Sequence, residues 1–160
     1  MGASQGNDRL DRARTAHLNV KIAAQRFDEH VERICQRHEI SQAQYGVLWV
    51  LCLSPKAKTG LPVGEVADGL ITRASDATRL IDRLESSGLV ERLRHPEDRR
   101  SVLVRATTKG KRVFRAVSPV IERFHADAWS RLTEAELERL DHLLMKALWS
   151  DSNEPKGSSC

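Results

Sequence analysis

The residues best suited to chemistry in this chain are arginines and small hydroxyl side chains, and they gather between residues 73 and 110. Residues 72–112 contain 11 lysines and arginines against 6 aspartates and glutamates, a net charge of +5, whereas the rest of the chain contains 15 against 16. Because a guanidinium group donates paired hydrogen bonds to a guanine edge or a phosphate, this local excess indicates a polyanionic partner. The stretch therefore predicts contact with double-stranded DNA.

An amphipathic helix is predicted at the start of this stretch. Four apolar residues, Ala77, Leu80, Ile81 and Leu84, follow helical spacing and should face a core, while Gly88 suits the position just after a helix end. The opposite face is polar and would be free to approach DNA. The side chains expected to contact DNA from this segment are Arg73, Ser75, Thr78, Arg79 and Arg83.

Two carboxylates, Asp76 and Asp82, also belong to this helix. They would repel phosphates unless an arginine pairs with them or they turn aside. The polar face of an ordinary surface helix shows a similar charge pattern, so the helix alone does not separate DNA binding from simple solvation.

A basic-tipped β-hairpin is predicted directly after the helix. Residues 89–94 and 101–106 are β-prone, and the HPEDRR sequence between them is typical of an exposed turn. A two-stranded ribbon is narrow enough to enter a minor groove, where the negative potential favours arginine. An ordinary basic turn is the alternative, and the adjoining helix argues against it. The residues expected to act from this wing are Arg94, Asp98, Arg99 and Arg100.

The elements before this region should position it. Residues 10–37 predict a long amphipathic helix, and Ser41 is a plausible N-cap for a second, largely buried helix. Pro62 suits the first turn of a short helix, followed by a turn at residues 69–72. A short helix, a turn and an amphipathic helix form a helix-turn-helix.

Two further helices are predicted after the hairpin. Thr107 or Thr108 should cap the first of them, and Pro119 should kink it. Thr133 and Glu136 have the spacing of a capping box for the second. The apolar stripes of the terminal helices are longer than the small central module could cover, so we expect them to bury one another across a homodimer.

The sequence thus predicts a mostly α fold with a small β-wing (α+β class), in which a winged helix-turn-helix module is flanked by N- and C-terminal dimerisation helices. We expect a disordered leader at 1–9, an N-terminal dimerisation helix at 10–40, the DNA-binding module at 41–108, C-terminal dimerisation helices at 109–150 and a disordered tail at 151–160.

Composition excludes several other classes of protein. The three cysteines are scattered and no CxxC pair occurs, which argues against a disulfide framework or a metal knuckle. No apolar run approaches a membrane span and no signal core precedes residue 10, so we expect a cytoplasmic protein without membrane contact. Glycine-rich phosphate loops, HExxH and nucleophile motifs are missing, so we expect neither an enzyme nor a cofactor.

The chain resembles the MarR-type winged helix-turn-helix regulators over nearly its whole length. The resemblance rests on ISQAQYGVL, PVGEVADGL, ATRLIDRLESSGLVER and HPEDRRSVLVRATTKG. The DxR signature of the family appears as Asp98 and Arg100, where Asp98 can orient a neighbouring arginine, and the LTxxG junction appears as Ala106, Thr107 and Gly110. Departures are Ala106 in place of leucine, and Asp76 with Ala77 where threonine and valine are common.

The resemblance implies a homodimer that places two recognition helices in successive major grooves of a pseudo-palindromic operator. It also implies a sequence-specific transcriptional repressor that a small aromatic or anionic ligand releases from DNA. Residues that could line the ligand pocket are Arg26, Phe27, His30 and Trp49.

Two alternatives remain open. One is a redox- or metal-sensing regulator of the same fold, for which Cys35, His38 and His30 are the candidate residues, although no fourth metal ligand converges by sequence. The other is a weakly specific structural DNA-binding protein, which would share the charge and the dimer but not the sequence preference.

Overall fold

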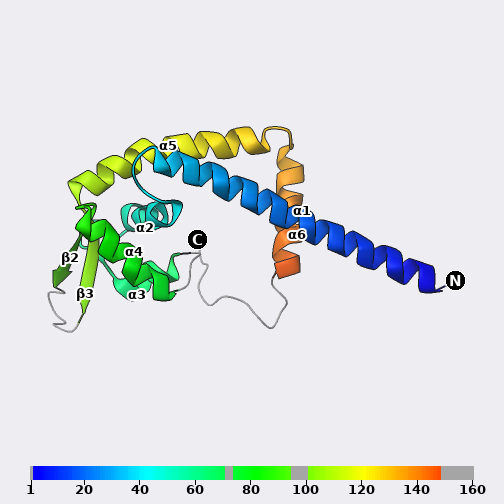
Figure 1. Ribbon diagram of the computed structural model, residues 1–160, viewed down its shortest axis with the longest axis horizontal. Helices are drawn as coiled ribbons and strands as arrows, with labels where there is room; N and C mark the ends of the chain where they lie inside the picture. Colours follow the sequence, from blue (N-terminus) through cyan, green and yellow to red (C-terminus); the bar gives the residue numbers. More distant parts are fainter. Residues whose placement is uncertain (1, 71–73, 95–100, 149–160) are drawn as a thin grey trace. The chain divides into compact units, whose positions relative to one another are not determined.

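The structure is a computed structural model that describes residues 2–70, 74–94 and 101–148, except the side chains of residues 2–7, 74 and 75. It forms two compact units, Met1–Ile121 and Glu122–Cys160. The elements labelled in Figure 1 are α1 (Gly2–Gln36), α2 (Gln42–Leu53), β1 (Leu61–Pro62), α3 (Val63–Asp68), α4 (Ala74–Ser86), β2 (Val90–Arg94), β3 (Val102–Ala106), α5 (Thr108–Trp129) and α6 (Glu134–Leu148). The predicted class, mostly helical with a small β-wing, is confirmed.

The core of the first unit lies between α2, α3, α4, the sheet and the first part of α5. Leu48, Leu51, Val66, Val104 and Val117 are almost completely buried there. The apolar stripe predicted for α4 is also confirmed, because its four residues are no more than 8% exposed: Ala77, Leu80, Ile81 and Leu84. Burial of this stripe fixes which face of α4 remains outside.

The sheet has three antiparallel strands in the order β1-β3-β2, rather than the two strands expected. The two-residue strand β1 pairs with Val104 and Leu103 of β3. Pro62 ends this edge strand and occupies the N-cap of α3 instead of its first turn, so that prediction is wrong by one position. A proline is tolerated there because an edge strand leaves one row of N–H groups unpaired.

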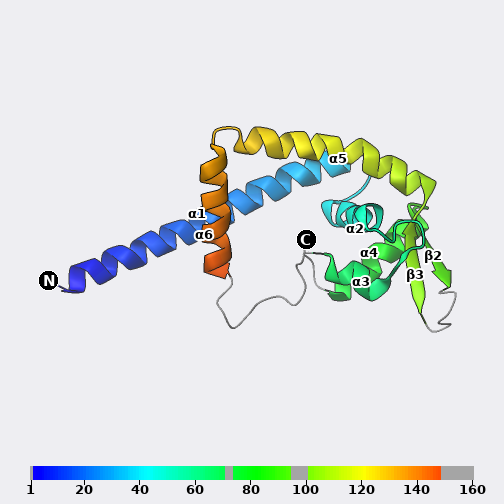
Figure 2. The same ribbon diagram turned by 180° about the vertical axis from the view of Figure 1, so that it is seen from behind.

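Helix α1 begins at Gly2, so the prediction of a disordered leader over residues 1–9 is wrong for residues 2–9. Ion pairs one helical turn apart support the early turns, since Arg12 lies 2.6 Å from Asp8 and Arg14 lies 3.3 Å from Asp11. In both views the first half of α1 extends beyond α2, α3, α4 and the sheet (Figures 1 and 2). Much of α1 is therefore outside the core of its own chain.

The ends of three helices follow recognisable capping patterns. Ser41 and Gln44 form a capping box at α2, with a 2.9 Å bond from the Ser41 N–H to Gln44 Oε1. Gly88 follows the end of α4 and has a φ of 69°, in the left-handed region. Glu39 follows the end of α1 in the same manner, with a φ of 60°. In both cases the next residue, Ile40 or Leu89, donates back to a carbonyl five residues earlier, as in a Schellman motif.

The described residues of the second unit form the end of α5 and helix α6. The predicted capping box is confirmed in part, because the Glu136 carboxylate accepts from the Thr133 N–H at 2.8 Å. None of the described residues of α6 is buried, and Leu143, Met145 and Leu148 are 47%, 48% and 66% exposed.

Helix α5 continues through Pro119 without ending there. No helix in the described residues is both long and apolar enough to cross a membrane.

Candidate nucleic-acid interface

The outer face of α4 is polar and accessible. Thr78, Arg79 and Arg83 are exposed, as expected from the burial of the opposite stripe. Ser75 belongs to the first turn of α4, although its side chain lies outside the described residues, as does the whole of Arg73. Hydroxyl and guanidinium groups on the exposed face of a short, rigid helix can reach base edges and phosphates in a major groove.

The wing strands adjoin this helix. Arg94 is exposed at the end of β2, and Val102 pairs with it at the start of β3. The predicted tip residues Asp98, Arg99 and Arg100 lie outside the described residues, so their roles stay predictions. Side chains alternate along a strand, so Arg94 shares a face of β2 with Val90, which is buried beside α4. The described end of the wing thus presents an arginine on the side where α4 packs.

Arg92, which the sequence analysis did not single out, joins the helix and the wing. Its Nη2 donates to Asp82 Oδ1 at 2.6 Å, and its Nη1 donates to Glu85 Oε2. The hydrogen bond to Asp82 is the main cause that raises the pKa of Arg92 above its ordinary value, and Glu85 adds to it. Asp82 was expected to repel phosphate unless paired, and the structure pairs it. The sequence carried one signal for this role: side chains alternate along a strand, so Arg92 lies on the same face of β2 as the apolar Val90.

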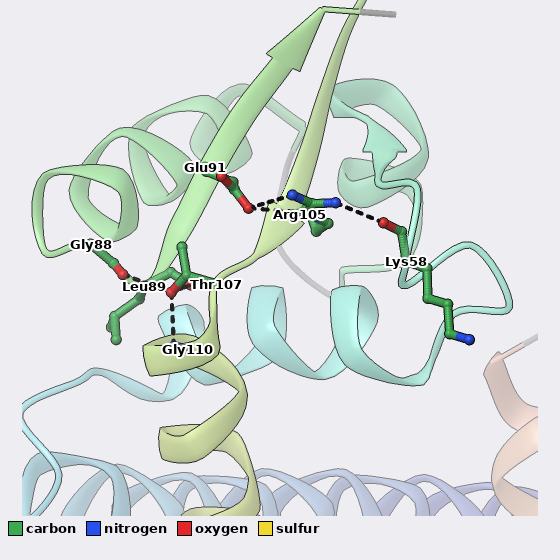
Figure 3. A network of polar contacts seen from close by, with 7 residues as sticks. All are labelled: Lys58, Gly88, Leu89, Glu91, Arg105, Thr107 and Gly110. Atoms are coloured by element: carbon green, nitrogen blue, oxygen red, sulfur yellow. Dashed lines mark hydrogen bonds and ion pairs between the residues drawn. The ribbon is translucent and has the colours of Figure 1, made fainter. Parts of the chain in front are cut away.

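A second arginine secures the base of the wing (Figure 3). Arg105 on β3 donates from Nε and Nη2 to Glu91 Oε1 at 3.0 and 2.9 Å, and the two residues are paired in the strand register. Its Nη1 donates to the carbonyl of Lys58 at 3.0 Å. One side chain therefore ties both wing strands to the loop that precedes β1 (Figure 3).

The junction between the wing and α5 explains the TxxG pattern (Figure 3). Thr107 Oγ1 donates to the Gly88 carbonyl at 2.8 Å and accepts from the Gly110 N–H at 3.1 Å, which makes Thr107 the cap of α5. A Cβ at Gly110 would lie 2.0 Å from the Leu89 carbonyl oxygen. Only glycine allows the helix to approach the strand so closely.

The predicted ligand-pocket residues lie on α1 and α2. Arg26 and His30 are exposed, Phe27 is half-buried and Trp49 is 47% exposed. The start of α2 is held to α1 by Gln42, whose N–H donates to Glu32 Oε2 at 2.7 Å. A hollow of about 430 Å³ lies elsewhere, on α6, and none of the four residues lines it. Their role as a pocket stays a prediction.

The cysteines bear on the sensing alternatives. Cys35 is fully buried, and burial together with the charge of Glu32 raises the pKa of its thiol to about 11. Burial also raises the pKa of Cys52, partly offset by Lys111 and Arg115. A protonated thiol is a poor nucleophile, so Cys35 lacks the acidity of a sensor cysteine. Among the described residues, no group of three or more His, Cys, Asp or Glu side chains is arranged to hold a metal ion.

A helix-turn-helix joined to an arginine-bearing β-hairpin defines a winged helix-turn-helix DNA-binding protein. Residues 40–102 match the model of the MarR family. The multiple antibiotic resistance protein MarR of Escherichia coli K12 is 32% identical over 130 residues, which are 81% of this chain and 88% of that protein. The chain belongs to the MarR family, whose members are transcription regulators and not enzymes.

Two further likenesses agree with this assignment. The transcriptional repressor IacR of Pseudomonas putida is 26% identical over 119 residues, 74% of this chain and 69% of that protein. The crystal structure of a mutant of Escherichia coli MarR complexed with operator DNA is 28% identical, with a TM-score of 0.71, and the match covers 89% of this chain and 97% of that chain. The protein is therefore a DNA-binding transcription regulator of this family.

Proposed function

We propose that this protein is a homodimeric repressor that binds a pseudo-palindromic operator and leaves it when a small aromatic or anionic ligand binds. One observation carries the proposal: the exposed face of α4, with Thr78, Arg79 and Arg83, lies next to a wing strand that ends in Arg94. Helix α4 enters the major groove, and the wing reaches the adjacent minor groove. The crystal structure of a MarR mutant complexed with operator DNA supports binding to an operator.

The homodimer is supported by apolar surface that the described chain leaves uncovered. Along α1, apolar and small residues recur at steps of three or four from Leu10 to Ile34, and the steps alternate strictly from Val20 onward. The stripe is buried at Val31 and Ile34, but Leu10 and Val20 are 48% and 49% exposed. A stripe with this period pairs with another helix, and a second copy of the chain supplies one.

Release by a ligand is supported by the character of the side chains on α1 and α2. The exposed ring of Trp49 offers an apolar surface, and Arg26 offers a cation for a carboxylate. Aromatic acids are therefore the first compounds to test. A compound that binds here should raise the melting temperature of the free protein and lower its affinity for DNA.

Selection from a random library of double-stranded DNA tests the proposal. We expect the wild-type protein to enrich a pseudo-palindromic sequence, called here the selected duplex, and to bind it as two chains per duplex. The control is a duplex of the same base composition in scrambled order, which should bind roughly 1000-fold more weakly at physiological salt. Failure to enrich any sequence would instead identify a weakly specific structural DNA-binding protein.

A further inference from the structure

One ion-pair cluster in the first unit joins the recognition helix to the wing and is not part of the expected DNA-contact set. Arg92 of β2 reaches two carboxylates on α4, at 2.6 Å from Asp82 Oδ1 and in direct contact with Glu85. The side chain of Arg92 is 28% exposed, whereas those of Asp82 and Glu85 are 56% and 40% exposed. The carboxylates are thus accessible to solvent, while the arginine lies between the helix and the strand.

The two carboxylates lie beside the surface that must approach DNA. Asp82 is three residues after Arg79, so the two side chains are neighbours on the exposed face of α4. An unpaired Asp82 would weaken the positive potential around Arg79 and would repel a nearby phosphate. Glu85, one turn further along, would add to this repulsion. Pairing both carboxylates with one guanidinium reduces it.

We propose that Arg92 is a positioning residue for DNA binding, which neutralises Asp82 and Glu85 and holds the recognition helix at a fixed place against the wing. The inference rests on the proposed function, because α4 must face DNA for these charges to matter. Arg92 acts through its partners and does not itself contact the phosphates.

The geometry of the arginine suits this role. A guanidinium has separate nitrogens in a fixed fork, and here Nη1 and Nη2 each bind a different carboxylate. Val90 precedes Arg92 on the same face of β2 and is buried, and Arg94 follows on that face. Along β2, Arg92 and its two ion pairs therefore lie between the buried Val90 and the exposed Arg94. They set the spacing between Arg79 and Arg94.

Neutralisation can be tested by rescue. We expect Arg92→Gln to weaken binding to the selected duplex about tenfold, because two like-charge repulsions are restored at the interface. Adding Asp82→Asn and Glu85→Gln should bring the affinity back to within roughly threefold of wild type, since the repulsion is then gone. Fluorescence anisotropy at several salt concentrations measures both, with Lys56→Gln, which breaks an ion pair to Glu65 outside α4, as the control.

The other outcomes are distinct. A triple variant that stays as weak as Arg92→Gln, with a salt dependence lower by about one unit, would show that Arg92 contacts phosphate directly and would overturn the inference. An unchanged Arg92→Gln affinity alongside a weakened Arg79→Ala variant would overturn it while the proposed function stands. If neither substitution changes binding, the placement of α4 in the groove is wrong, and the inference with it.

Folding is checked by the thermal melts of the same variants. Where Arg92→Gln does not fold, Arg92→Lys replaces it, because a single ammonium keeps the charge but loses the fork. Its affinity should fall and should recover when Asp82→Asn and Glu85→Gln are added. A loss that these substitutions do not repair would count against the role of Arg92.

Discussion

Arg79 is the single residue on which base recognition should depend most, because it projects from the middle of the exposed face of α4. We expect Arg79→Ala to weaken binding to the selected duplex by about 1–3 kcal/mol, the typical value of a side chain that contacts a base edge. Binding to the scrambled duplex should fall much less. Anisotropy titrations on both duplexes measure the difference, and equal losses would restrict Arg79 to phosphate contact.

Gly110 is the residue with the least tolerance for a side chain. We expect Gly110→Ala to lower the free energy of unfolding by about 1–3 kcal/mol, because the new Cβ would meet the Leu89 carbonyl and force the strand and helix apart. Gly64→Ala is the matched control, since nothing lies within 4 Å of a Cβ at that position. Urea denaturation compares the two, and equal stabilities would contradict the close approach.

Cys35 should make stability depend on alkaline pH. Its thiol ordinarily has a pKa of 9.0, which burial and Glu32 raise to about 11 in the folded chain. The unfolded chain therefore loses the proton first, and stability that is present below pH 9 is lost as the pH rises towards 11. This fall should reach about 2 kcal/mol. Urea denaturation at pH 8 and pH 10.5 should show it in the wild type and to a smaller extent in Cys35→Ala.

Sequence reasoning found the single residues that follow from a helical period and missed those that depend on pairing across the fold. Thr78, Arg79 and Arg83 could be placed outside because the opposite stripe is apolar. The role of Arg92 could not be predicted in this way, since its partners on α4 are brought to it by the packing of a strand against a helix. The close approach at Gly110 was visible only as a family pattern, because its cause is the carbonyl of Leu89.

Among the elements, the end of α1 offers a clear test of local strain. Glu39 has a φ of 60° in the position where glycine usually closes a helix. We expect Glu39→Gly to raise the free energy of unfolding by about 0.5–1 kcal/mol, because a side chain is disfavoured in that conformation. Glu39→Ala keeps a Cβ and should change stability little. Thermal melts of both distinguish them, and a destabilised Glu39→Gly would show that Glu39 is not strained.

Long periodic elements were predictable and short or weakly patterned ones were not. The stripe of α4 and the change of period at Leu89 gave the recognition helix and two wing strands. Strand β1 has only two residues, too few for any period, and its partner on β3 is distant in the chain. The early turns of α1 lack an apolar pattern, and their helix is supported by charge pairs such as Asp8 with Arg12.

For the whole molecule, assembly is the property most open to test. We expect Leu143→Glu to shift the protein from dimer to monomer, because this exposed residue of α6 should be buried by a second copy. Glu138→Lys, on the same helix, is the control and should leave the dimer intact. Sedimentation velocity over a range of concentrations measures the change. A monomeric wild type would contradict the proposed homodimer.

The contact between Gly110 and Leu89 also makes the joint between α5 and the wing a poor hinge. Backbone meets backbone there, and the Thr107 hydroxyl bonds to both sides, so the contact leaves little room to absorb a movement. A tilt of the first turn of α5 would be passed to Leu89, and so to the end of α4 and the start of β2 together. Helix α5 can then act as a lever that turns helix and wing as one piece.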